Sequence, residues 1–227
     1  MNDLQRYFDH NTGRVIDKWE HYLEIYDRYF SRFRGTAVTM VEIGVFRGGS
    51  LQMWKQYFGP KARIVGIDVD PQCKSYEEDQ IQVLIGDQQD RSFLRSVRAA
   101  VPHVDILLDD GGHTMKQQIN TFEELFPHID PNGVYLCEDL HTSYRTAWGG
   151  KYKGRGTFIE YAKNFVDSLN AWHSKVPWYS GRPRRPWVTD FTRTAYSLHF
   201  YDSILVIEKR PMQPPRRRIT GGGAAPP

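Results

Sequence analysis

The stretch from Asp105 to His113, Asp-Ile-Leu-Leu-Asp-Asp-Gly-Gly-His, is a short apolar strand that runs into two carboxylates, two glycines and a histidine. A buried strand that ends in this way delivers polar side chains to the loop beyond it, and the glycines let another group approach the backbone. The stretch 137–141, Cys-Glu-Asp-Leu-His, follows another apolar run in the same manner. The two stretches predict a site where two strand ends meet.

Apolar runs and helical segments alternate on both sides of this stretch. We expect strands at 38–43, 62–69, 81–85, 104–108 and 133–137, and helices at 49–58, 91–100, 115–126 and 157–173. Helical connections of about ten residues imply parallel strands with right-handed crossovers. The runs 193–201 and 203–209 are joined almost directly at Asp202, so they must pair antiparallel. The sequence therefore predicts an α/β fold, a Rossmann-like doubly wound sheet of parallel strands closed by an antiparallel C-terminal hairpin, as in class I methyltransferases.

The composition is that of one soluble domain, with 227 residues, 40% of them hydrophobic and 25% charged. No apolar run approaches the roughly 20 residues that span a bilayer, and the first residues do not resemble a signal peptide, so we expect a cytoplasmic protein without a membrane partner. The two cysteines, Cys73 and Cys137, lie far apart and suit free thiols in a reducing compartment.

The chain divides into three predicted parts. Residues 1–35 carry aromatic side chains at helical spacing and should form one or two amphipathic helices, which either pack as plain core or cover a ligand as a lid. Residues 36–210 form the main domain, in which the loop 177–186 should be exposed and irregular. Residues 211–227 are too rich in proline and glycine to pack, and we expect a disordered tail.

Residues 41–50, Val-Glu-Ile-Gly-Val-Phe-Arg-Gly-Gly-Ser, place a carboxylate in a strand and glycines in the turn to a helix. Gly44 and Gly48 would let the backbone approach a ligand, and the helix start after Gly49 offers free N–H groups. The spacing is not that of the dinucleotide fingerprint Gly-x-Gly-x-x-Gly. Glu42 would repel a pyrophosphate but attract a ligand that carries an α-ammonium group and a sulfonium.

Further acids stand at the ends of the following strands. Asp68 ends the second strand, where an acid usually binds a ribose diol, and Asp87 ends the third, within reach of an adenine amino group. A helix N-cap is the alternative role for Asp87 taken alone. With Glu42 and Asp109 these acids make a rim that matches S-adenosylmethionine. We predict this cofactor, with contacts from Glu42, Gly44, Gly48, Ser50, Asp68, Asp87, Gln88 and Asp109.

Three more carboxylates, those of Asp110, Glu138 and Asp139, follow the fourth and fifth strands, which are neighbours in a doubly wound sheet. Carboxylates that converge in a crevice repel one another unless a cation lies between them. Oxygen ligands without thiolates favour Mg²⁺ over zinc. In the alternative interpretation Asp139 caps a helix and Glu138 pairs with an arginine such as Arg145.

The motifs at 41–54, 86–88, 109–118 and 135–144 closely resemble those of the metal-dependent sugar O-methyltransferases of macrolide tailoring, of the mycinamicin and rhamnosyl types, a group related to the cephalosporin hydroxylase family. The resemblance runs from about residue 38 to residue 209, and the two acidic motifs are long and specific.

This resemblance implies that Asp110, Glu138 and Asp139 hold Mg²⁺ and that His113 is the general base, with His141 as a competing base or a substrate contact. It also implies a small-molecule glycoside as the methyl acceptor and a homo-oligomeric enzyme. We expect no separate N-terminal domain of the kind that the longer members have, and the N-terminal helices are then the candidate for a lid.

Two other functions stay open at this stage. A catechol or other phenol could be the acceptor instead, held by aromatic stretches around Trp148, Trp178 and Trp187. A binding domain without turnover, or an RNA-binding protein, is the other possibility. The net charge of +3 comes from arginines gathered at 182–185 and 216–218, and the acidic crevice opposes nucleic acid, so we expect no nucleic-acid partner and assign no role to the basic loop.

Overall fold

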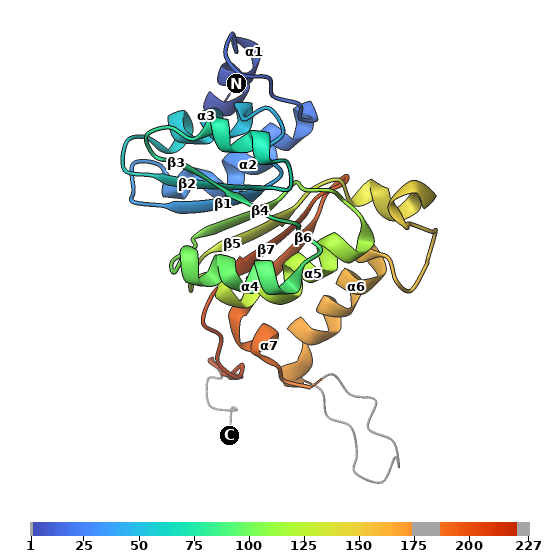
Figure 1. Ribbon diagram of the computed structural model, residues 1–227. Helices are drawn as coiled ribbons and strands as arrows, with labels where there is room; N and C mark the ends of the chain where they lie inside the picture. The colour runs from blue at the N-terminus through green and yellow to red at the C-terminus, as the bar shows by residue number, and fades with distance from the viewer. Residues whose placement is uncertain (1, 174–186, 222–227) are drawn as a thin grey trace, which may run out of the picture.

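A single mixed sheet organises the protein, as seen in a computed structural model that describes residues 2–173 and 187–221. The strands lie in the order β3-β2-β1-β4-β5-β7-β6 (Figure 1). Their bounds are β1 Thr39–Ile43, β2 Arg63–Asp68, β3 Ile81–Ile85, β4 Ile106–Asp109, β5 Val134–Cys137, β6 Ala195–Phe200 and β7 Leu205–Lys209. Each strand begins and ends within two residues of its prediction.

Strands β1 to β5 are parallel, and β7 pairs antiparallel with both β5 and β6. The predicted fold class is therefore confirmed, including its C-terminal hairpin. The chain leaves β1 toward β2 and β3 and returns to β4 on the other side of β1, so the strand order reverses between β1 and β4. In register, Ile43 lies beside Asp109, and Asp109 beside Cys137. A ligand crevice is expected at the carboxyl ends of strands at such a reversal.

Helices cover both faces of the sheet (Figure 1). The helices α1 (Asp3–Asp9), α2 (Glu20–Phe30) and α3 (Gly49–Phe58) supply one buried apolar cluster together with side chains from one face. The other face is covered by α4 (Arg91–Ala100), α5 (Met115–Leu125), α6 (Phe158–Leu169) and the short α7 (Asp190–Thr194). Burial on both faces explains why the central strands read as continuous apolar runs.

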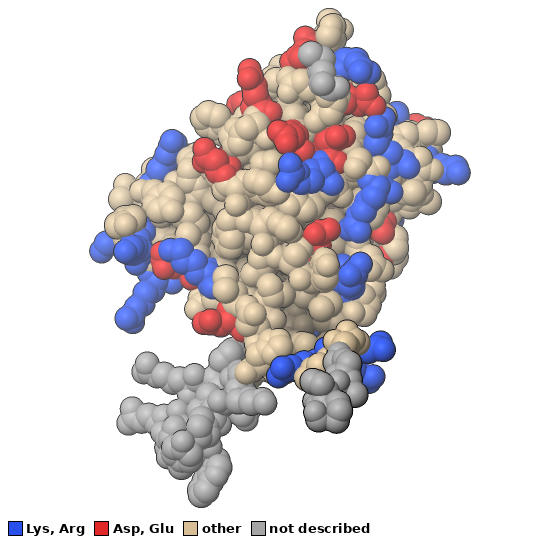
Figure 2. Space-filling view, turned by 180° about the vertical axis from the view of Figure 1, so that it is seen from behind, with Lys and Arg blue, Asp and Glu red and all other residues tan. Residues whose placement is uncertain are grey.

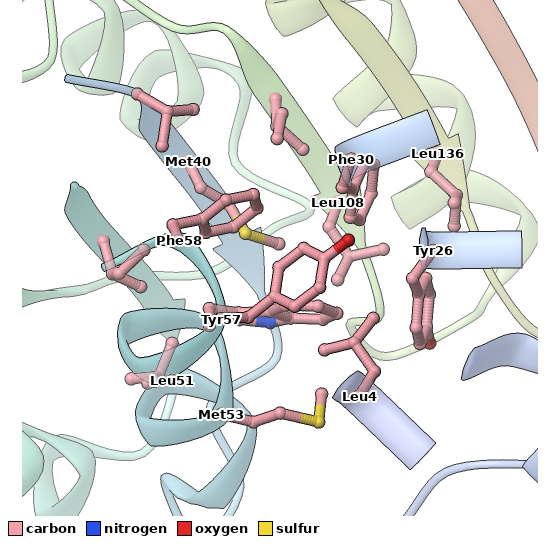
Figure 3. Close-up of a cluster of buried hydrophobic side chains, with 14 of the residues drawn as sticks. Leu4, Tyr26, Phe30, Met40, Leu51, Met53, Tyr57, Phe58, Leu108 and Leu136 are labelled. Carbon is pink, nitrogen blue, oxygen red and sulfur yellow. The ribbon is translucent and has the colours of Figure 1, made fainter. Parts of the chain in front are cut away.

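The aromatic residues of the N-terminal helices lie in the core. Tyr26 and Phe30 are fully buried, and Trp54 of α3 meets the Tyr26 ring edge to face at 5.1 Å between centroids. Figure 3 shows Tyr26 and Phe30 beside Leu4 of α1 and Tyr57 of α3. The helices and their core packing are thus confirmed, and they anchor the intervening segment 10–19 against the sheet.

The remaining predictions about the chain concern its surface and its ends. Residues 211–221 contain no helix or strand, while the loop 177–186 and the last six residues of the tail lie outside the described residues. In the described part, no helix combines the length and the apolar character needed to cross a membrane. On the face seen in Figure 2, lysines and arginines lie scattered among acidic residues around a largely uncharged centre.

Candidate active site

A cavity of about 870 Å³ opens at the carboxyl ends of the strands around the reversal point. Its volume falls in the upper part of the range for small-molecule sites, roughly 300–1,000 Å³. The predicted site residues on its wall are Gly44, Asp68, Asp87, Gln88, Asp110, His113, Glu138 and Asp139, joined by His141. The predicted residues Glu42, Gly48, Ser50 and Asp109 are buried and are not among the residues that line the cavity. One cavity therefore unites the two acidic stretches.

The turn after β1 is packed tightly against the loop after β4. Gly44 has φ +96°, and a Cβ at this position would lie 1.9 Å from the carbonyl oxygen of Asp110. Only glycine allows this approach. Asp68 fixes the same turn, because its carboxylate accepts the N–H groups of Val45 at 2.8 Å and Phe46 at 3.1 Å. The backbone is therefore set in place before any ligand arrives.

Two of the predicted cofactor acids are fully buried. Glu42 accepts a hydrogen bond from the hydroxyl of Ser50 at 2.8 Å, and burial raises the pKa of Glu42 to about 7. Asp109 accepts from the amide of Gln88 at 2.6 Å, and burial raises the pKa of Asp109 to about 7 as well. The oxygen of Gln88 accepts the N–H of Gly112 at 3.0 Å. Asp109 and Gln88 thus fix the backbone of the Gly111–Gly112 turn through these hydrogen bonds.

On the wall itself, Asp110, His113 and Asp139 form a compact cluster. One ligand atom from each residue lies within 4.8 Å of the others. His113 Nε2 is 3.3 Å from Asp139 and 3.8 Å from Asp110. The hydroxyl of Tyr22 donates to Asp139 at 2.8 Å. Two carboxylates at this spacing fit a hard cation such as Mg²⁺, which binds oxygens at about 2.1 Å.

Glu138, the third predicted metal ligand, has other partners. Its carboxylate accepts a hydrogen bond from Tyr26, and both of its oxygens lie 3.1 Å from the ammonium of Lys18. Lys18 also contacts Asp110 closely and lies 3.6 Å from Glu42. Burial alone would lower the pKa of Lys18, but these carboxylates raise it well above its usual value, so the ammonium is retained. The partner of Glu138 is Lys18 and not the arginine suggested above.

His113 is suited to accept a proton. Burial lowers the pKa of its imidazole, against the opposing effect of Asp110 and Asp139, so the ring is neutral at pH 7. Its backbone has φ +56°, and Phe46 and Asp139 on the same wall have φ +52° and +55°. Each such non-glycine residue stores roughly 1–3 kcal/mol of strain, a feature that gathers at functional sites.

The competing base, His141, is engaged elsewhere. Its Nδ1 lies 2.6 Å from the hydroxyl of Ser203, and its ring meets Trp19 edge to face at 6.1 Å. Trp19 is 56% exposed, so this pair offers an aromatic surface at the cavity mouth. His141 Nδ1 also lies 3.9 Å from Asp139, but His113 is nearer to that acid, at 3.3 Å, and lies 3.8 Å from Asp110 as well.

Sequence reasoning missed Lys18 and the tyrosine hydroxyls that bond the acids. Lys18 is 92 residues from Asp110 and 120 residues from Glu138 along the chain, so no local spacing reveals the contact. Tyr22 and Tyr26 belong to the predicted aromatic helices, but the direction of their hydroxyl groups depends on how α2 packs. The sequence feature that could have pointed to this contact is the position of Lys18 directly before an aromatic helix.

Comparison with known proteins shows which family and which relatives the chain is similar to. A family described as "Methyltransferase domain" matches residues 41–140. The 8-demethyl-8-alpha-L-rhamnosyl tetracenomycin-C 2'-O-methyltransferase of Streptomyces olivaceus is 38% identical over 204 residues, which are 86% of this chain and 52% of that protein. The mycinamicin VI 2''-O-methyltransferase of Micromonospora griseorubida is 35% identical, over 81% of this chain and 47% of that protein. The chain spans about half the length of the curated relatives it matches.

Among solved structures, the chain is similar to the MycE methyltransferase from the mycinamycin biosynthetic pathway in complex with Mg and SAH. The TM-score is 0.81 at 29% identity, and the match covers 92% of this chain and 55% of that one. A second structure of that protein, in complex with Mg, SAH and mycinamycin VI, gives a TM-score of 0.80.

Proposed function

We propose that this chain, whose residues 41–140 are a methyltransferase domain, transfers a methyl group from S-adenosylmethionine to a sugar hydroxyl of a glycosylated natural product, with Mg²⁺ as a cofactor. One observation carries the proposal. The turn predicted to bind the cofactor and the cluster of Asp110, His113 and Asp139 open into the same cavity. Relatives that methylate rhamnosyl and macrolide sugars support the choice of acceptor.

On the cofactor side, Gly44, Asp68, Asp87 and Gln88 line the cavity. We assign the ribose to Asp68 and the adenine edge to Asp87, because these acids follow adjacent strands. Glu42 lies beneath the wall, and its Oε1 has no hydrogen-bond partner among the described residues. Because this oxygen faces the ammonium of Lys18 at 3.6 Å, Glu42 acts on the ligand's ammonium group only through its charge and at a distance.

On the acceptor side, Asp110 and Asp139 would hold Mg²⁺, and Glu138 would join them if Lys18 withdraws. A sugar hydroxyl loses its proton reluctantly, and a bound Mg²⁺ lowers the pKa of an oxygen it touches and orients it. His113 takes the proton, because its imidazole is neutral and lies within the cluster of acids that would hold the hydroxyl's metal. Positioning of the two substrates accounts for much of the remaining rate gain.

The cellular location and the oligomeric state complete the proposal. Cys73 and Cys137 are free and buried, which suits a reducing compartment and supports a cytoplasmic location. A homo-oligomer is proposed from the family resemblance. Light scattering of the purified protein measures the oligomeric state directly.

The test is transfer of a labelled methyl group from S-adenosylmethionine to a panel of rhamnosyl and deoxysugar glycosides, with catechols as the comparison. We expect glycosides to be preferred, and chelation by EDTA to abolish activity until Mg²⁺ is restored. His113→Ala should lower turnover about 10²–10⁴-fold while affinity for S-adenosylhomocysteine stays within a few-fold. His103→Ala, at the opposite end of β4, is the matched control. Full activity in EDTA would remove the metal from the mechanism.

A further inference from the structure

The ammonium of Lys18 lies in the middle of the acidic cluster. It contacts Asp110, lies 3.1 Å from both carboxylate oxygens of Glu138, and is 3.6 Å from Glu42. Its side chain is only 2% exposed. A buried ammonium among three buried or half-buried carboxylates neutralises charge that would otherwise oppose folding.

The same place is the one that a metal held by both Asp110 and Glu138 would take. An ion bound to both Asp110 and Glu138 would sit about 2.1 Å from an oxygen of each. That space lies between two carboxylates that Lys18 already bridges. A divalent ion and an ammonium cannot share it, because two cations at contact distance repel strongly in a buried site.

We propose that Lys18 is an internal competitor for the metal, so that loading of Mg²⁺ at Asp110 and Glu138 requires the ammonium of Lys18 to withdraw. This inference rests on the proposed function only in placing the metal at these acids. It gives Lys18 two positions, one that stabilises the metal-free protein and one that accompanies the loaded protein.

The segment that carries Lys18 permits a local movement. Residues 11–19 form no helix or strand, and the segment is anchored upstream. Arg14 forms an ion pair with Glu78 at 3.3 Å and donates to the carbonyl of Tyr76 at 3.0 Å. Downstream, α2 begins at Glu20. Only the few residues between Arg14 and α2 must therefore shift.

The acids keep other donors when Lys18 leaves. Tyr26 still donates to Glu138 and Tyr22 to Asp139. Asp17 and Trp19, the neighbours of Lys18, are exposed and line the cavity, so the withdrawn ammonium reaches solvent rather than apolar core. The exchange therefore replaces one cation by another without dismantling the cluster.

Metal binding and lysine accessibility test the proposal. Mn²⁺ binding is measured by calorimetry for the full chain and for Lys18→Met, Lys18→Arg and Lys163→Met, the last being an exposed lysine on α6. We expect Lys18→Met to bind Mn²⁺ about 10- to 100-fold more tightly, with Lys18→Arg and Lys163→Met close to the wild type. In the wild type, acetylation of Lys18, followed by mass spectrometry, should accelerate at least several-fold with saturating Mn²⁺, while acetylation of Lys163 stays constant.

The outcomes separate this inference from the proposed function. If Mn²⁺ binds the wild type but Lys18 stays protected, or if Lys18→Met binds no more tightly, competition is overturned while the metal-dependent function stands. If Mn²⁺ binds none of the proteins, both the competition and the metal in the proposed function are overturned. Should Lys18→Met fail to fold, the acetylation rates of the wild type decide alone.

Discussion

Replacing Gly44 by alanine tests how the cofactor turn and the acidic cluster depend on each other. Gly44 has φ +96°, and the new Cβ would lie 1.9 Å from the carbonyl oxygen of Asp110, whereas real Cβ atoms keep at least 3.0 Å. Asp110 would have to retreat by more than an ångström. Its N–H donates to the carbonyl of Ile43 at 2.9 Å, and that hydrogen bond would be lost.

The expected loss in the free energy of unfolding has two parts. The left-handed backbone costs alanine roughly 1–2 kcal/mol. The lost hydrogen bond and the displaced loop bring the total to about 3–4 kcal/mol. Because Asp110 moves by about 1 Å, methyl transfer should fall about 100-fold even at saturating cofactor.

Gly59→Ala is the matched control, because Gly59 has φ +89° with nothing within 4 Å of the added Cβ. Its ψ of −173° belongs to a region that is essentially restricted to glycine, so it should lose only the backbone part, about 1–3 kcal/mol, and should keep its activity. Urea unfolding followed by circular dichroism gives both values, and calorimetry gives the affinity for S-adenosylhomocysteine. If Gly44→Ala is no less stable than Gly59→Ala, the close approach to Asp110 does not matter and the reasoning is refuted.

Three further changes probe the supports of the site and the core. Tyr26→Phe removes a donor from the buried carboxylate of Glu138 and should lower the free energy of unfolding by about 1–3 kcal/mol. Gln88→Leu leaves Asp109 without its amide donor and should cost about 2–3 kcal/mol, with weaker cofactor binding. Lys209, whose pKa burial lowers to about 8, binds its proton more weakly in the folded than in the unfolded chain. Between pH 8 and 10.5 the wild type should therefore gain stability relative to Lys209→Met, by at most about 3 kcal/mol.

Each of these three predictions has its own control. Tyr57→Phe removes a hydroxyl that donates to Asp27 at 2.7 Å in a less buried setting, so it should cost less than Tyr26→Phe. Gln89→Leu changes an exposed neighbour of Gln88 and should be nearly neutral. Equal losses within either pair would contradict the assigned hydrogen bonds. For Lys209, a stability difference that does not vary over this pH range would show that its ammonium is not perturbed.

Local sequence was enough for the architecture, because the strands and helices of this protein follow from short-range physics. Strands buried on both faces must be apolar along their length, and each helix must present an apolar stripe, so both patterns are legible in the chain. The near absence of a connection at Asp202 leaves only antiparallel pairing for β6 and β7. Parallel strands also bring their carboxyl ends to one edge, which is why Asp110 and Asp139 could be placed together from sequence.

Tertiary structure alone decided which of the neighbouring acids face the cavity and what neutralises them. Asp109 and Asp110 are adjacent, yet the first points into the core beneath Gln88 and the second onto the cavity wall, because side chains alternate in direction where β4 ends. The helices α1 and α2 pack their aromatic faces against α3, and this packing places the segment between them at the strand ends. Lys18 reaches the acids only because of this placement. That contact joins residues that are 92 and 120 positions apart in the chain, and its energy comes from charges that meet only after folding.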